Sequence, residues 1–171
     1  MKYSDEQFLK FAESKYPSTR AFIAKNKDCP FFILEMLAMD VNKDVQCGVA
    51  WNYNCPDYIL DLLSRRGTFF DVKIAVAEHK NTSIATLEKL AINKYWQVRD
   101  TVALNKNSNE NILLKIYNYN ISNNYGNYGS EILIKNKNCP FYILKEIYKK
   151  SNEIMKNNIK NHPNWKLNDF E

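Results

Sequence analysis

The chain has 171 residues, 45% apolar and 25% charged, which is the composition of a soluble globular protein with a buried core. No apolar run approaches the roughly 20 residues of a membrane-spanning helix. The N-terminus also lacks a signal-peptide apolar region, so we expect a cytoplasmic protein with no membrane partner. The net charge is +5, and residues 86–171 carry all of it, with 13 basic and 8 acidic residues. This imbalance indicates an acidic partner, but it is weaker than the basicity of a dedicated nucleic-acid-binding domain.

The first predicted element is a helix over residues 5–14, where Ser4 and Gln7 have the spacing of a capping box. We interpret residues 1–16 as a capping helix.

A short phrase then recurs along the chain, from IAKNKDCP at 23–30 to NIKNHPNW at 158–165. We call its central residue the anchor. The anchors are Asn26, Asn52, His79, Asn105, Asn136 and Asn161, at intervals of 26, 27, 26, 31 and 25 residues. Such near-equal intervals indicate an internal repeat.

Each repeat predicts two short helices joined by a turn. In the second copy, the first helix covers Val45 to Trp51, residues 52–54 form the turn, and the second helix runs from Cys55-Pro56 to about Leu63. Mostly apolar residues recur 7, 8 and 11 positions after the anchor, and they mark one face of the second helix. The next copy is the natural partner for that face.

The repeat therefore predicts an all-α fold: a right-handed, HEAT- or armadillo-like α-solenoid of about six two-helix repeats of about 26 residues. We expect a single domain, with repeats over residues 17–164 and a tail over residues 165–171 that covers the last repeat.

The pattern Val-x-x-x-Val-Ala-x-Asn-x-x-Thr/Cys-Pro-x-x-x-Leu-x-x-Leu-Ala resembles the leucine-rich repeat variant family of bacterial, HEAT-like helical repeats. The best matches are Val45 to Leu63, Val72 to Ala91 and Val98 to Ile116. The resemblance implies the fold and a scaffold role, and it carries no catalytic residues. The 20 lysines against 4 arginines, with 23 asparagines, are typical of an AT-rich genome such as that of a low-GC bacterium or its phage.

We interpret the anchors and cysteines as structural. Stacked asparagines would form a ladder of hydrogen bonds to turn backbone, with His79 as a structural substitute. Cys29, Cys55 and Cys139 fall where a helix N-cap is expected, just before prolines at the first helical position. No C-x-x-C spacing is present, so we expect reduced thiols, no metal and no cofactor.

Two sets of residues are candidates for binding. Lys27, Lys80, Lys106 and Lys137 each follow an anchor and would line one edge of a solenoid. With Trp51 and Tyr53 among them, this basic edge could follow a phosphate backbone, or it could be a solvated turn. The segment 118–129 interrupts the repeat, and its Tyr119, Tyr125 and Tyr128 are candidate partner contacts, as are Trp51 and Tyr53. A flexible insertion is the alternative.

The first helices also carry a row of residues expected to be exposed: Gln46, Lys73, Arg99 and Glu131. No hydrolase, P-loop or metalloprotease motif is present. We therefore predict a non-catalytic scaffold that binds a protein partner and has no small-molecule substrate. A nucleic-acid-binding repeat protein is the alternative. A third candidate is a HEAT-like DNA glycosylase using Trp96, Arg99 and Asp100.

Overall fold

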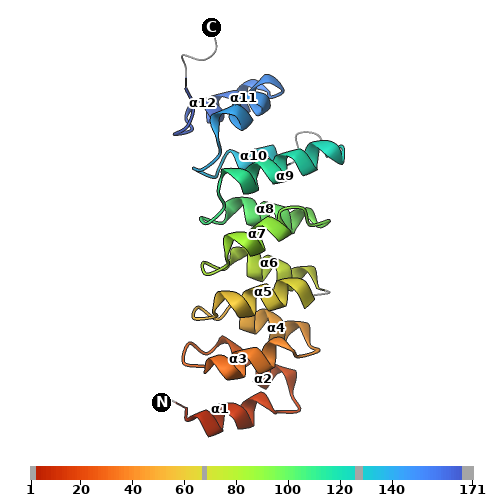
Figure 1. Cartoon of the computed structure of the whole chain (residues 1–171), viewed down its shortest axis with the longest axis vertical. Coiled ribbons are helices and arrows are strands. Elements are labelled where there is room, and N and C mark those ends of the chain that lie inside the picture. Colours follow the sequence, from red (N-terminus) through yellow and green to blue (C-terminus); the bar gives the residue numbers. More distant parts are fainter. Residues whose placement is uncertain (1–2, 67–68, 126–128, 167–171) are drawn as a thin grey trace. The chain divides into compact units, whose positions relative to one another are not determined.

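The computed structural model describes residues 3–66, 69–125 and 129–166, and over these residues it contains only helices, twelve in number, and no strand (Figure 1). The all-α prediction is therefore confirmed. The helices are α1 (Asp5–Ala12), α2 (Pro17–Lys25), α3 (Phe31–Ala38), α4 (Lys43–Ala50), α5 (Asp57–Arg66), α6 (Phe70–Glu78), α7 (Ile84–Leu90), α8 (Trp96–Leu104), α9 (Glu110–Ser122), α10 (Ser130–Leu133), α11 (Phe141–Lys149) and α12 (Glu153–Lys160).

The chain divides into two compact units, Met1–Thr86 and Leu87–Glu171, which we call the N-terminal and C-terminal units. In the N-terminal unit, α2 packs against α4 and α4 against α6, while α3 packs against α5. In the C-terminal unit, α8 packs against α9 and α10, and α11 packs against α12. Helix α7 crosses the boundary between the units.

Helix α1 begins as predicted. The side chain of Ser4 accepts a hydrogen bond from the Gln7 N–H, and the Gln7 side chain accepts one from the Ser4 N–H, which completes the capping box. The helix ends at Ala12 rather than at residue 14. Its buried Phe8 and Ala12 face α2 and α3, against which α1 packs.

The cores of both units use the helix face that the repeat marks. The residues 7, 8 and 11 positions after the anchor are buried in α3 and α5 of the N-terminal unit and in α9 and α11 of the C-terminal unit. A substitution such as Leu60→Ala would empty one of these sites, at a cost of about 2–5 kcal/mol of stability.

The second helices begin one or two residues later than predicted. Pro30 and Pro140 are N-cap residues with extended backbone, and their carbonyl oxygens accept hydrogen bonds from the N–H groups three and four residues later. The prediction of proline at the first helical position is therefore wrong, and so is the placing of cysteine at the N-cap. The ψ angles of Pro30 and Pro140 are 148° and 153°, which is extended backbone, so the proline as well as the cysteine before it stays outside the helix.

Helices α2 and α4 approach closely because the residues between them are small. A Cβ atom on Gly48 would lie 2.9 Å from the Ala21 carbonyl oxygen and 3.1 Å from the Ala24 Cβ. Glycine is therefore required for this separation of the two helices.

Candidate functional site

The turn that follows each first helix is fixed by its anchor. In the N-terminal unit, the Asn52 side-chain amide donates hydrogen bonds to the carbonyl oxygens of Ala24 at 2.7 Å and Asn26 at 2.8 Å. The Asn52 Oδ1 accepts a hydrogen bond from the Asn54 N–H. The side chain thus joins one turn to the previous turn and closes its own turn.

His79 occupies the next anchor and makes equivalent contacts. Its Nδ1 accepts a hydrogen bond from the Asn81 N–H at 3.1 Å, so Nε2 carries the proton and donates to the Asn52 carbonyl oxygen at 2.9 Å. Burial lowers the pKa of His79, against the opposing effect of its hydrogen bond to Asn52. The structural interpretation of this histidine is confirmed.

The C-terminal unit repeats the arrangement and corrects one anchor. The Asn136 amide donates to the carbonyl oxygens of Ala103 and Asn105, and the His162 Nε2 lies 3.0 Å from the Asn136 carbonyl oxygen. The sixth anchor is therefore His162 rather than Asn161. The signal was in the sequence, because His162 and Asn164 repeat the spacing of His79 and Asn81.

A second set of side chains, two residues after the anchors, also links successive turns and was missed in the sequence. The side-chain amides of these residues donate to backbone carbonyl oxygens of the preceding turn at 2.8–2.9 Å. They are Asn54, Asn81, Asn138 and Asn164. The turns therefore form a rigid edge within each unit.

All four cysteines are buried free thiols. Burial raises the pKa of Cys29, Cys55 and Cys139 to about 12, which leaves little reactive thiolate near neutral pH. Thr82 and Ser108 occupy the same repeat position, and each hydroxyl donates to the carbonyl oxygen of the preceding helix at 2.5 Å. The hydroxyls of Thr82 and Ser108 therefore tie the turn to the first helix, whereas the thiols of Cys29 and Cys55 lie against the carbonyl oxygens of Pro30 and Pro56.

The edge of the N-terminal unit carries two exposed aromatic rings, on either side of the buried Asn52. Trp51 is 53% exposed and Tyr53 is 66% exposed. The Lys25 ammonium lies 4.8 Å from the Trp51 ring centroid, and the Lys80 ammonium lies 3.0 Å from the Tyr53 centroid. We call these four residues the turn-edge surface.

Two cavities open on the turn-edge surface, and both are lined by Tyr53 and Lys80. The first, of about 410 Å³, extends to Pro30 and Phe31 and is also lined by Lys27. The second, of about 290 Å³, is lined by Trp51. Aromatic walls with charged rims are typical of the anchor pockets of protein interfaces.

Three of the four lysines of the predicted basic edge are exposed. Lys27 is exposed in the N-terminal unit, and Lys106 and Lys137 are exposed in the C-terminal unit. Lys80 is half-buried, because its side chain lies over Tyr53.

The first part of the segment 118–129 is helical. Helix α9 extends to Ser122, so Tyr119 and Asn120 are helical rather than in a loop, while Tyr125 follows the helix. Arg99 is only 1% exposed, and its Nε donates to the Asn120 Oδ1 at 3.0 Å. The Arg99 guanidinium lies 4.8 Å from the Tyr119 ring centroid and 4.9 Å from that of Tyr125. These two tyrosines therefore have a structural contact, and Tyr128 lies outside the described residues.

The predicted exposed row on the first helices is wrong at two of its four positions. Gln46 and Arg99 are buried, and each donates to a backbone carbonyl oxygen six residues earlier in the chain, Gln46 to Asp40 and Arg99 to Asn93. These long polar side chains reach the loop before their own helix, which no apolar pattern reveals. Arg99, proposed as a glycosylase residue, is thus engaged inside the fold.

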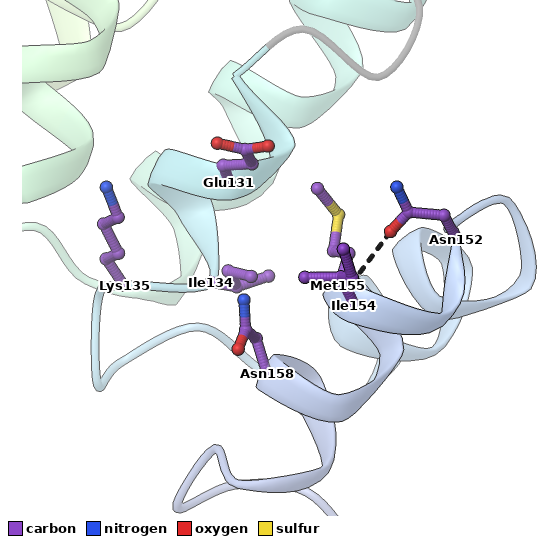
Figure 2. A pocket seen from close by; sticks show the side chains of 7 residues that line it. All are labelled: Glu131, Ile134, Lys135, Asn152, Ile154, Met155 and Asn158. Atoms are coloured by element: carbon purple, nitrogen blue, oxygen red, sulfur yellow. Dashed lines mark hydrogen bonds between the residues drawn. The ribbon is translucent and has the colours of Figure 1, made fainter.

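A larger cavity, of about 580 Å³, lies in the C-terminal unit between α10 and α12 (Figure 2). In Figure 2 the side chains of Ile134, Met155 and Asn158 converge on it. Glu131, Ile134 and Asn158 take the repeat positions that Ala21, Ala24 and Gly48 hold in the N-terminal unit. These larger residues prevent close helix approach and leave the groove, in which no aromatic side chain is present among the lining residues.

The described residues contain no cluster of three His, Cys, Asp or Glu side chains that could hold a metal ion. None of the described helices has the length and apolar character needed to cross a lipid bilayer. Comparisons with protein-family models, curated proteins and solved structures found no match for this chain.

Proposed function

We propose that this chain is a non-catalytic binding module whose partner is another protein. We propose further that its helices belong to a right-handed α-solenoid of about six two-helix repeats, as in the leucine-rich repeat variant family. The recurrence of the anchor hydrogen bonds in both units supports this architecture. Solenoid repeats commonly present rows of side chains to a partner.

The observation that carries the function is the exposure of Trp51 and Tyr53 on a turn that Asn52 holds rigid. Tyrosine and tryptophan are enriched among the residues that contribute most to protein interfaces. Because the turn is already ordered by hydrogen bonds, binding would restrict little additional conformational freedom. We therefore place the partner on the turn-edge surface.

A non-catalytic role fits the engagement of the reactive side chains. Both histidines hold turn backbone in place, and the thiols are buried with raised pKa values. A general base or nucleophile must instead reach a substrate.

Nucleic acid is the second candidate, because Lys27, Lys106 and Lys137 are exposed next to the anchors. The aromatic rings favour a protein over this alternative. Lys25 and Lys80 each lie over a ring of the turn-edge surface and cover a face on which a base would stack.

The test is affinity capture from a lysate of the source cells with the full chain, followed by binding measurements on the purified partner. Trp51→Ala with Tyr53→Ala is expected to weaken the partner's affinity at least 10-fold while the melting temperature stays unchanged. Tyr58→Ala is the matched control, since Tyr58 is also about half exposed but lines neither cavity. Equal binding by the two variants would contradict the proposal.

A further inference from the structure

The two cavities of the turn-edge surface meet at a ridge formed by Tyr53 and Lys80, and this ridge carries a positive charge. Tyr53 and Lys80 line both cavities, and the Lys80 ammonium lies over the Tyr53 ring. A ligand that occupies both cavities must therefore cross a positively charged ridge.

The cavities themselves favour apolar groups. The larger one offers Pro30, the exposed ring of Phe31 and one side of Tyr53. The smaller one has the buried Ala50 and Ala75 beside Trp51 and Tyr53. Volumes of about 410 and 290 Å³ leave room for large apolar side chains in contact with aromatic walls.

Each cavity also has one acidic residue in its lining. Asp28 lines the larger cavity and Glu78 lines the smaller one. A uniformly acidic ligand would meet repulsion from an acidic residue in each cavity, although Lys27 moderates it at the larger cavity. The surface therefore favours an acidic group next to Lys80 and disfavours acidic groups next to Asp28 and Glu78.

Resting on the proposed function, we infer that the turn-edge surface binds a short extended peptide segment with the pattern apolar, any, acidic, any, apolar. In an extended segment the side chains of alternate residues point to the same face, so the first, third and fifth would all meet the surface. The two apolar side chains fill the cavities, and the central carboxylate meets the Lys80 ammonium on the ridge. Such partly desolvated contacts to a charged donor give specificity.

The test uses a phage-displayed library of random nine-residue peptides selected on the full-length chain. We expect enrichment of an aspartate or glutamate two residues from apolar residues on both sides. The best peptide is then synthesised with a fluorescent label, in its acidic form and with lysine at the central position. Fluorescence polarisation should show the acidic form binding the wild-type chain at least 10-fold more tightly.

Lys80→Glu should reverse that preference, so that the lysine peptide binds more tightly than the acidic one. Lys73→Glu, on α6 and outside both cavities, is the matched control and should keep the wild-type order. Circular dichroism melting of both variants shows whether they fold. An oligoglutamate peptide and a single-stranded DNA oligonucleotide should compete poorly.

Selection of peptides without a central acidic residue, or no selection at all, would overturn the inference. So would an unchanged order of affinity in a folded Lys80→Glu variant, or competition by DNA at the strength of the peptide. These outcomes leave the proposed function standing if Trp51→Ala with Tyr53→Ala still weakens binding of the captured protein partner. The two failures are therefore distinguishable.

Discussion

At the anchor of the third repeat, a histidine makes the contacts that asparagine makes in the second. Asn52 accepts an N–H with its side-chain oxygen and donates with its amide, and His79 does so with its two ring nitrogens. A neutral imidazole can serve in both roles, but a protonated imidazole has two donors and no acceptor. Protonation would therefore place a donor against the Asn81 N–H.

This geometry predicts a pH-dependent stability. Because burial lowers the pKa of His79 below its ordinary value of 6.5, the unfolded chain takes up the proton first as the pH falls. The folded state should therefore lose stability as the pH falls below about 6.5, by no more than about 1.4 kcal/mol per pH unit from His79. Above about pH 6.5, the contribution of His79 to the free energy of unfolding should stay constant.

The variant His79→Asn should keep the ladder and lose this dependence. Urea unfolding of both proteins at pH 7.5 and pH 5.5 measures the difference, and other titrating groups cancel between them. The same loss of stability on acidification in both proteins would contradict the assignment.

A second prediction at the residue scale concerns Cys55. Thr82 occupies the same repeat position and donates to the Val76 carbonyl oxygen, so Cys55→Thr should donate to the Val49 carbonyl oxygen. Such a hydrogen bond contributes about 0.5–1.5 kcal/mol, and the variant should be as stable as the wild type or more stable. Cys55→Ala is the control, which loses packing and gains no bond. Urea unfolding in which threonine destabilises as much as alanine would refute this.

At the scale of elements, helices α8 and α9 are joined through the buried Arg99. In the N-terminal unit, Arg20 at the equivalent position pairs with the Asp40 carboxylate at 2.6 Å. Arg99 instead has the Asn120 amide oxygen, two backbone carbonyl oxygens and two tyrosine rings. A buried charge depends strongly on such partners, because water is excluded from it.

Asn120→Leu should therefore destabilise the chain by about 1.5–3 kcal/mol, the contribution of a hydrogen bond to a charged group. Asn118→Leu, exposed on the same helix, should change stability by less than about 0.5 kcal/mol. The double variant with Arg99→Met and Asn120→Leu should lose less free energy of unfolding than the sum of the losses in the two single variants, as expected for coupled residues. Chemical unfolding of the four proteins measures this, and strict additivity would argue against the coupling.

The same helices show what the sequence can predict. The spacing of Ile112, Leu113 and Ile116 indicated a buried helix face, because apolar residues recur at the helical period. The contact between Arg99 and Asn120 had no such signal, since Asn120 lies in the inserted segment and outside the repeat. The two rings beside Asn52 were recognised as candidates, but the cavities next to them are formed by residues from three successive turns, and only coordinates bring those together.

At the scale of the whole molecule, the placement of charge separates the two candidate functions. The anchors place Lys27 and Lys80 in the N-terminal unit and Lys106 and Lys137 in the C-terminal unit. A nucleic acid bound by all four of these lysines would use both pairs. A protein partner on the turn-edge surface would use only the first pair.

The test replaces each pair of lysines with glutamine and measures affinity for duplex DNA and for the captured protein partner across a range of salt concentrations. We expect the first pair of substitutions to weaken partner binding and the second to leave it unchanged, because Lys27 and Lys80 line the cavities beside Tyr53. Affinity for DNA should stay in the non-specific range, roughly 10⁻⁴–10⁻⁶ M. If nucleic acid is the ligand, substitution of either pair will instead reduce the salt dependence of DNA binding. The slope of log affinity against log salt concentration should fall by up to about 0.9 for every phosphate that a lysine no longer neutralises. Equal effects of the two pairs on a tight DNA complex would therefore reject the protein partner in favour of the nucleic acid.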